Sequence, residues 1–593
     1  MVELTKRDRA MLSGEMGPAT QMAMRILVTM AGVYGAERLL DIESAHIDGC
    51  LYHGYSGLEF AERLATGGAQ VVVPTTLNVG AMDLIHPEVF QGTEQVGRWA
   101  TRMMQAYEAM GCRPTFTCAP YQAMHRPPLG AQVAWAESNA IVFANSVLGA
   151  RTNRYGDFID ICCAITGRAP DVGLHRSENR AGQILFRLVG IPDRLLREDV
   201  LFPVLGYWLG ARTGTKIPVI QGLRSDTTED QLKALGAAAA SSGGVALFHA
   251  AGVTPEAPSI EAAFQGHTPE AVVDVTLEDL QETLGVLSTV PDGPIQVVAL
   301  GSPHFSLDEF DRLLPLVEQF PPRPDVEFIV CTHRLALVAL QQRSWLERLR
   351  AAGVQVIVDT CVVVTPIVRA RGGVLMTNSG KFAHYSPGNI GLQVVYGSLE
   401  ECVRSAAAGE VWRDASLWTA DGRPLTAAYS PQPAMDQAPV ESELVNRHSS
   451  LATHASGQRS VVDGRVLVEG VATGAALVLD TPLSLWGGLD PETGDIIDQR
   501  HPQWRANVTG KVLVMPVGKG SSSASSILLE AVRLGTAPAA ILLAEPDAIL
   551  ALGAAVAREL YGVAPPVVVL DGVMYGRIRD ASPVQIANGA VTA

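Results

Sequence analysis

The sequence predicts a multidomain α/β protein in which parallel-sheet α/β subdomains are followed by a C-terminal β/α domain. Three observations lead to this fold class. Apolar strands alternate with helices between residues 290 and 365, the composition changes between 425 and 458, and short β runs resume after 459. The length of 593 residues also favours several domains, because one domain usually holds about 100 to 200 residues.

The composition is that of a globular protein with large buried cores. Hydrophobic residues make up 47% of the chain and charged residues 18%, so disorder is not expected. A formal net charge of −16 argues against binding to nucleic acid or to an anionic membrane. The N-terminus lacks the apolar stretch of a signal peptide, and no apolar run is long enough to span a bilayer. We therefore expect a cytoplasmic location.

The first third of the chain mixes helices with short strands. Residues 5–45 are predicted to be helical, because apolar residues recur there at helical spacing: Met22, Ile26, Leu27, Met30 and Val33. Strands are expected at 70–74 and 115–117, with a helix at 93–110 between them. A turn at 118–121 follows the second strand.

The strands between residues 290 and 365 each end at a residue with metal-binding chemistry. They are predicted at 295–300, 327–330 and 355–358, and the residues that follow them include Ser302, Cys331 and Cys361. The repeats are about 30 residues long, as in βαβ units. The carboxyl ends of parallel strands form the ligand-binding edge of an open sheet, so these three residues should share one rim. None of the eight cysteines forms a CxxC pair, and packing as a buried thiol is the alternative for each.

The C-terminal unit contains a glycine- and serine-rich turn between a strand and a helix. Residues 426–458 are predicted to be a linker and 459–593 a compact β/α domain with strands at 461–468, 474–478 and 512–517. The last strand leads into Gly518-Lys-Gly-Ser-Ser-Ser523. Free N–H groups at a helix start favour anions and can stabilise a serine alkoxide. A simple capped turn is the alternative interpretation.

Several motifs together resemble those of the aconitase X family. They are MLSGEMGPATQMAM (11–24), SAHIDGCLYHG (44–54), VPTTLNVG (73–80), TCAPY (117–121) and VDTC (358–361). The resemblance implies an aconitase-like core, with a large-subunit-like region at 1–425 fused to a small, swivelling domain at 459–593. It also implies an iron–sulfur-dependent dehydratase, a hydro-lyase acting on a small molecule. Fused bacterial members resemble cis-3-hydroxy-L-proline dehydratases and split archaeal members mevalonate 5-phosphate dehydratases, so the fusion favours the first.

The resemblance implies cluster ligands at Cys118 and Cys361. Ser302 stands where many family members have cysteine, and serine is a poorer iron ligand than thiolate. Cys331 is slightly favoured over Cys50 as the third ligand. This departure favours a [2Fe–2S] cluster over [4Fe–4S], with mononuclear iron as a further alternative.

Candidate catalytic and substrate-binding residues come from these motifs and from three further places. These are the serine turn, which resembles the Gly-Ser-Ser turn of the aconitase superfamily, a polar cluster just past Cys361 that contains Lys381, and Arg212, which could clamp a carboxylate. Ser521 is the expected base, with Ser522 and Ser523 as close alternatives. His46 and Asp48 are expected to orient leaving water or to carry a proton. Substrate binding is expected from Thr75, Thr76, Asn78, Lys381, Arg212 and Ser523. Helix capping is the alternative for the threonines, and a surface ion pair is the alternative for Arg212.

Three other functions remain open from the sequence. Mevalonate 5-phosphate dehydration needs a basic phosphate pocket, and no cluster of lysine and arginine stands out. A swivelling phosphotransfer domain needs a histidine nucleophile, but the last histidine is His501, well before the serine turn. A cysteine hydrolase needs a Cys–His pair, for which Cys331 with His333 is the local candidate.

Overall fold

A computed structural model describes residues 2–419, 461–499, 501–518, 521–587 and 589–592, with the side chains of 461–463 left out. The predicted linker at 426–458 therefore lies outside the described residues, as does Lys519. The described part contains five sheets of two, three, four, five and eight strands. Within it, no helix has both the length and the apolar character needed to cross a membrane.

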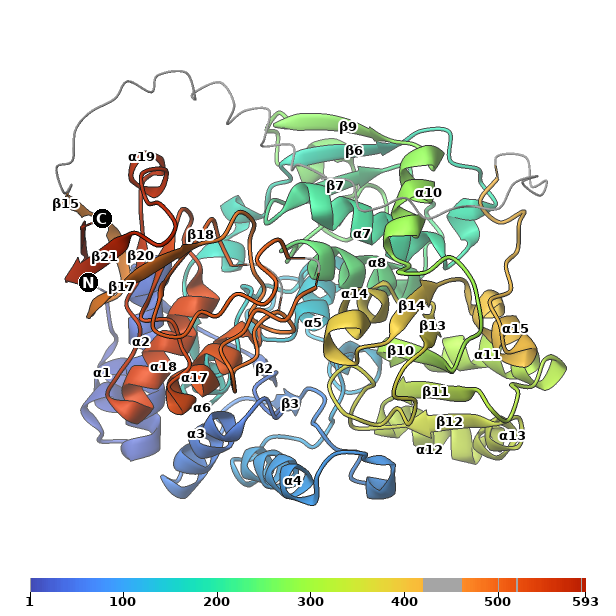
Figure 1. Cartoon of the computed structure of the whole chain (residues 1–593), viewed down its shortest axis with the longest axis horizontal. Helices are drawn as coiled ribbons and strands as arrows, with labels where there is room; N and C mark the ends of the chain where they lie inside the picture. The colour runs from blue at the N-terminus through green and yellow to red at the C-terminus, as the bar shows by residue number, and fades with distance from the viewer. Residues whose placement is uncertain (1, 420–460, 500, 519–520, 588, 593) are drawn as a thin grey trace.

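The N-terminal region surrounds a small parallel sheet with helices (Figure 1). The sheet has the order β3-β2-β4, and β1 pairs separately with β5. The elements are α1 Lys6–Ser13, α2 Pro18–Tyr34, β1 Leu39–Asp41, β2 Ser44–Ile47, α3 Tyr55–Thr66, β3 Thr75–Leu77, α4 Glu94–Ala109, β4 Val133–Trp135, α5 Ser138–Phe143, α6 Ile159–Thr166 and β5 Arg168–Pro170.

The first region contains some of the predicted elements, and its short strands differ most from the prediction. The helix predicted at 93–110 is confirmed by α4. The helical prediction for 5–45 holds through α2 but is wrong beyond it, because β1 and β2 follow. The strand predicted at 70–74 begins later, as β3. Residues 115–117 form no strand, although the Thr115 hydroxyl donates to the Leu77 carbonyl at 2.8 Å.

The second region is a parallel four-stranded sheet of order β8-β7-β6-β9. Its helices α7 and α8 face the rest of the molecule (Figure 1). The elements are β6 Ile184–Leu188, α7 Leu201–Thr213, β7 Pro218–Gln221, α8 Glu229–Ser242, β8 His249–Ala250, α9 Ile260–Ala263, β9 Ala271–Val275 and α10 Leu277–Val286.

The third region confirms the predicted parallel sheet between residues 290 and 365. Its order is β12-β11-β10-β13-β14, so the chain reverses direction across the sheet on leaving β12, and β10 lies at the switch point. Such a point is where open α/β sheets bind ligands. The elements are β10 Val297–Phe305, α11 Leu307–Gln319, β11 Glu327–Thr332, α12 Arg334–Gln342, α13 Trp345–Ala351, β12 Val354–Ile357, β13 Val374–Thr377, α14 Gly380–Asn389, β14 Gln393–Tyr396 and α15 Leu399–Ala408.

The C-terminal domain is an eight-stranded mixed sheet. Its helices α17 and α18 pack against α3 and α2 of the first region. The predicted strands correspond to β15, β16, β17 and β18. The elements are β15 Val461–Asp463, β16 Arg465–Val468, β17 Val471–Val478, β18 Val512–Met515, α17 Ala524–Leu534, β19 Ala540–Leu543, α18 Ala548–Tyr561, β20 Val567–Val569, α19 Gly572–Tyr575, β21 Pro583–Ala587 and β22 Ala590–Thr592.

The contact between α17 and α3 depends on one buried carboxylate. Glu530 accepts the backbone N–H of Ser56 at 2.8 Å and pairs with Arg533 at 2.6 Å. A Cβ atom on Gly54 would lie 2.4 Å from the Glu530 carboxyl carbon, so glycine is needed for this close approach. One acid thus joins the C-terminal domain to the loop that precedes α3.

We expect Glu530→Ala to lower the melting temperature, because it leaves a buried N–H without an acceptor, which costs about 1–3 kcal/mol. Differential scanning calorimetry measures the change. Glu318→Ala is the matched control, since the Glu318–Arg348 pair is about half exposed and exposed ion pairs contribute little to stability. Equal melting temperatures for the two variants would contradict a role for Glu530 in domain docking.

Candidate active site

One pocket lies where the first, third and C-terminal regions meet. The first region supplies residues that follow β2, β3 and β4, and the third supplies the ends of β10 and β12 together with α14. The C-terminal domain supplies the serine turn before α17. The polar and aromatic side chains that line it are Asp48, Asn78, Cys118, Glu137, Ser138, Ser302, Cys361, Lys381, Tyr385, Trp486, Ser521, Ser522 and Ser523.

Two of the predicted cysteine ligands face this pocket. Burial raises the pKa of the Cys118 thiol to about 12 and that of Cys361 to about 11, where the charge of Lys381 acts in the opposite direction. The backbone N–H of His304 donates to the Cys118 sulfur at 3.3 Å. N–H donors and a nearby cation favour the thiolate form, which is the form that binds metals.

The other two cysteine candidates lie outside the pocket. Cys331 is fully buried at the end of β11, in the same large core cluster as Cys361. Cys50 is also buried, and its thiol donates to the Asn78 carbonyl at 3.2 Å. Neither lines the pocket, but the charges of Cys361 and Cys118 act on the Cys331 thiol and help to raise its pKa, so Cys331 as the third ligand stays a prediction. Ser302 does line the pocket.

The donor set fits iron with fewer thiols than a four-iron cluster uses. Across the described residues, no group of three or more His, Cys, Asp and Glu side chains is arranged to hold a metal ion. Cys118 and Cys361 nevertheless share the pocket with the Ser302 hydroxyl. Two thiolates with one oxygen donor can bind iron, although they bind it less strongly than three thiolates would.

The serine turn reaches the pocket through Asp48. The Ser522 hydroxyl donates to Asp48 Oδ2 at 2.5 Å, and the Asn78 amide donates to Oδ1. Burial raises the pKa of Asp48, and the charge of Glu137 adds to this effect. Ser521 also lines the pocket, and its oxygen accepts the N–H of Ser523 at 3.2 Å.

Two further buried carboxylates bind the residues on either side of the Ser522–Asp48 hydrogen bond. Asp157 accepts the Ser526 hydroxyl at 2.5 Å and the Ser523 hydroxyl at 3.4 Å. Burial raises the pKa of Asp157, and the charge of Asp48 raises it further. Asp160 accepts the N–H of Asp48 at 2.7 Å. Burial raises the pKa of Asp160 to about 7, against the effect of its N–H donors.

Lys381 is held by a carboxylate that the sequence did not indicate. It pairs with Glu137, which also caps α5 by accepting the N–H of Ala140 at 2.8 Å. Burial alone would lower the pKa of Lys381, but the charge and hydrogen bond of Glu137 outweigh it and the pKa is raised. The backbone of Glu137 has φ of 71°, a conformation that is uncommon outside glycine.

Four of the predicted site residues lie away from the pocket. His46 bonds to the Thr76 hydroxyl at 2.9 Å and packs on Trp135 at 5.7 Å, and burial lowers its pKa to about 3. The Thr75 hydroxyl donates to the Val73 carbonyl. Arg212 stacks on Trp208 at 4.0 Å in the second region. These contacts account for the four side chains by packing.

Other residues of the site escaped the sequence analysis. Glu137 and Trp486 line the pocket but belong to no motif that indicates chemistry. Asp157 and Asp160 could have been found, because two acids in the apolar run YGDFIDICC need buried partners. Tyr385 also lines the pocket, with its ring 4.5 Å from that of Trp486.

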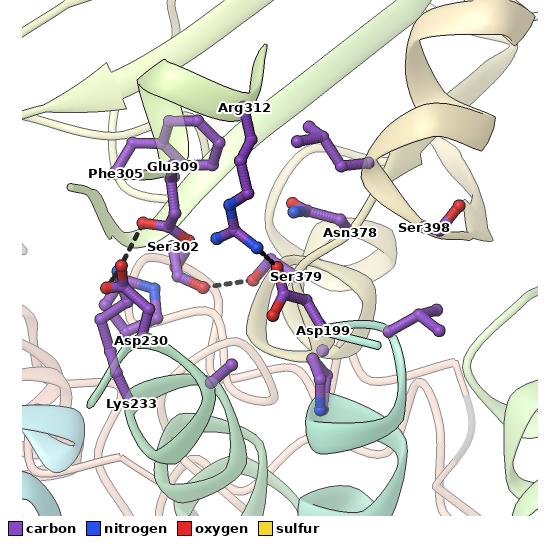
Figure 2. A pocket seen from close by; sticks show the side chains of 17 residues that line it. Asp199, Asp230, Lys233, Ser302, Phe305, Glu309, Arg312, Asn378, Ser379 and Ser398 are labelled. Carbon is purple, nitrogen blue, oxygen red and sulfur yellow. Dashed lines mark hydrogen bonds and ion pairs between the residues drawn. The ribbon is translucent and has the colours of Figure 1, made fainter. Parts of the chain in front are cut away.

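A second pocket is lined in part by Ser302, which also lines the first (Figure 2). Its cations all face carboxylates: Lys233 contacts Asp230 at 2.7 Å and Glu309 at 2.6 Å, and Arg312 pairs with Asp199. Within this pocket the Ser379 hydroxyl donates to the Ser302 carbonyl.

Fold and site together define a multidomain α/β enzyme whose C-terminal domain completes the active-site pocket. Residues 1–178, 182–285, 295–408 and 461–592 match the family models Aconitase X first domain, second domain, third domain and swivel domain. The chain therefore belongs to the aconitase X family.

The relatives agree on the class of reaction. The chain is 42% identical over 417 residues to a cis-3-hydroxy-L-proline dehydratase of Pseudomonas aeruginosa, covering 70% of this chain and 71% of that one. It is 39% identical over 407 residues to a phosphomevalonate dehydratase large subunit of Methanothermobacter thermautotrophicus, covering 68% of this chain and 98% of that one. The crystal structure of Thermococcus kodakaraensis aconitase X (holo-form) matches with a TM-score of 0.62 at 32% identity, covering 68% of this chain and all of that one. The protein is accordingly a hydro-lyase.

We expect the stability of the protein to fall as pH rises through the titration of Asp160. Its folded pKa of about 7 lies above the unfolded value of about 4. Its contribution is therefore fully present below about pH 4 and is lost as pH rises through about 7, by about 1.4 kcal/mol per pH unit between the two values.

Scanning calorimetry from pH 4.5 to 8 measures this dependence. Asp160→Asn should show a shallower fall of melting temperature with pH than the unchanged protein. The exposed Asp308 provides the control variant Asp308→Asn, whose curve should parallel that of the unchanged protein. A parallel curve for Asp160→Asn as well would contradict the assignment.

Proposed function

We propose that this protein dehydrates cis-3-hydroxy-L-proline to Δ1-pyrroline-2-carboxylate. The observation that carries the proposal is the charge of the pocket. Among the described residues that line it, Asp48 and Glu137 are the acids and Lys381 is the one cation, already paired with Glu137. This suits a small zwitterion with one carboxylate and one ammonium group, since opposite charges attract strongly where water is excluded.

The same charges disfavour a phosphate-bearing substrate. A phosphate monoester carries close to two negative charges at neutral pH and would need uncompensated cations in the pocket. Lys381 shares its charge with Glu137, and Lys233 and Arg312 in the neighbouring pocket also face acids. This balance supports the hydroxyproline proposal over mevalonate 5-phosphate.

Cys118, Cys361 and Ser302 would hold the iron centre. We favour a two-iron cluster over a four-iron cluster, because no third thiol lines the pocket. When bound, iron with an open coordination position supplies a Lewis acid for the hydroxyl that leaves. The positive charge of Lys381 acts on both thiols and favours their thiolate forms. The same charge would also attract the substrate carboxylate.

Ser521 is the proposed base, in the turn of the C-terminal domain that lines the pocket before α17. Its oxygen accepts the Ser523 N–H, which stabilises negative charge on that oxygen. The Ser522 hydroxyl is instead donated to Asp48. Ser521, as its alkoxide, would take the proton from C2 of the substrate as hydroxide leaves C3. That proton then passes to the hydroxide, so that water is released and the base is regenerated. The resulting enamine tautomerises to the cyclic imine, so the reaction is a loss of water with no change of oxidation state overall.

Substrate and metal assays on anaerobically purified protein test this proposal. Turnover of cis-3-hydroxy-L-proline, together with iron and matching acid-labile sulfide, is the expected result. Turnover of mevalonate 5-phosphate alone would overturn the substrate assignment. Absence of both iron and sulfide after reconstitution would overturn the cofactor, and iron without sulfide would indicate a mononuclear centre.

We expect Ser521→Ala to lower kcat by about 10²–10⁴-fold, the usual contribution of a general base, with iron content unchanged. Steady-state kinetics with a parallel iron assay measures both. Ser525→Ala is the control. Ser525 is buried in the first turn of α17, where its hydroxyl donates to the Ser522 carbonyl at 3.1 Å, and it does not line the pocket. If Ser521→Ala kept full activity and Ser522→Ala lost it, the base would be Ser522.

A further inference from the structure

We propose that His304 is a positioning residue that fixes the spacing between the thiols of Cys118 and Cys361. The inference rests on the proposed function in that these thiols hold the iron centre. His304 itself is fully buried and is not among the residues that line the pocket.

The His304 ring joins the two segments that carry the cysteines. Its Nδ1 lies 2.9 Å from the hydroxyl of Thr117, the residue before Cys118. Its Nε2 lies 3.2 Å from the carbonyl oxygen of Thr360, the residue before Cys361. One rigid ring therefore connects the residue before each cysteine, through a side-chain hydroxyl at Thr117 and a backbone carbonyl at Thr360, across segments that are far apart in the sequence.

The partners decide which nitrogen carries the proton. The Thr360 carbonyl can only accept, so Nε2–H donates to it. Nδ1 then accepts from the Thr117 hydroxyl, whose oxygen in turn accepts the N–H of Ala119 at 3.1 Å. Every group in this chain of hydrogen bonds has one defined role, which fixes the orientation of the ring.

The backbone of the same residue makes a third connection. The His304 N–H donates to the Cys118 sulfur at 3.3 Å. The His304 carbonyl accepts the side-chain amide of Gln122 at 3.0 Å and the ammonium group of Lys233 at 3.4 Å. Lys233 is itself held by two acids of the second pocket (Figure 2). The ring is thus anchored to a frame outside the active site.

Such a connection matters because a cluster binds only at defined sulfur positions. Groups that orient metal ligands from behind usually change metal affinity by about 10–100-fold when they are removed. With two thiols in the pocket rather than three, fewer metal bonds hold the loops in place, so the protein must set the spacing itself.

The test compares His304→Phe with His249→Phe. His249 is also buried and bonds through Nε2 to the Arg180 carbonyl at 2.7 Å, in the second region away from the cysteines. Iron per chain, the visible spectrum and the rate of iron release to a chelator are measured on anaerobically reconstituted protein. We expect His304→Phe to release iron about 10–100-fold faster with an altered spectrum, and His249→Phe to match the unchanged protein.

Two further measurements keep the test decisive. Thr117→Val removes only the hydroxyl partner of the ring and should also speed iron release. It provides the test if His304→Phe fails to fold. In the metal-free protein, alkylation of Cys118 and Cys361, mapped by peptide mass spectrometry, should be faster in either variant than in His249→Phe.

The outcomes separate this inference from the proposed function. Unchanged iron release and unchanged alkylation in the folded variants would overturn the role of His304. Equal effects in His249→Phe would also overturn it, because any lost buried histidine would then suffice. If the unchanged protein binds no iron, the cofactor proposal fails, whereas the alkylation rates still decide whether His304 orders the two thiols.

Discussion

The hydrogen bond between Ser522 and Asp48 is the contact on which the rest of the site depends. Asp48 is 3% exposed, and a buried carboxylate is costly unless its oxygens are hydrogen-bonded. Asn78 satisfies one oxygen and the serine of the C-terminal domain satisfies the other. The first region alone would leave that second oxygen without this partner. Docking of the C-terminal domain therefore completes both the hydrogen bonding of Asp48 and the wall of the pocket.

Asp157 extends this dependence along the domain boundary. It accepts hydroxyls of Ser523 and Ser526 and lies close enough to Asp48 for their charges to interact. Three acids gathered in one buried region repel one another when ionised, and hydroxyl donors from α17 offset that repulsion. The turn must therefore present serines rather than small apolar residues, independently of which serine acts as base.

The sequence predicted the parts of the structure that depend on local pattern. The βα repeats between 290 and 365 are periodic, and the third-region sheet has the predicted strands. Cys361 and Ser302 reach the pocket because strand ends share an edge, whereas Cys331 at the end of β11 is buried in the same core cluster as Cys361 and does not line the pocket. Glu137 could not be predicted, because its position depends on a positive φ and on a lysine that is 244 residues away in the chain.

The strand β10 links the local and the long-range parts of this argument. Ser302 faces the active-site pocket, while its carbonyl and that of His304 are held from the second pocket by Ser379 and Lys233. The peptide bond between Ser302 and Pro303 is cis, and Gly301 lets β10 approach the Cys331 carbonyl, where a Cβ atom would lie at 2.1 Å. The same few residues thus provide a hydroxyl to the pocket, an N–H to Cys118 and a ring between the two cysteine segments. In the proposed iron site, a serine at position 302 would bind metal less strongly than a thiolate, and the contacts made by His304 would supply order at Cys118 and Cys361. The number of thiols that bind the metal and the rigidity of the surrounding protein are in this sense coupled. Where a metal–thiolate bond is absent, a contact within the protein must hold the spacing of the remaining thiols instead.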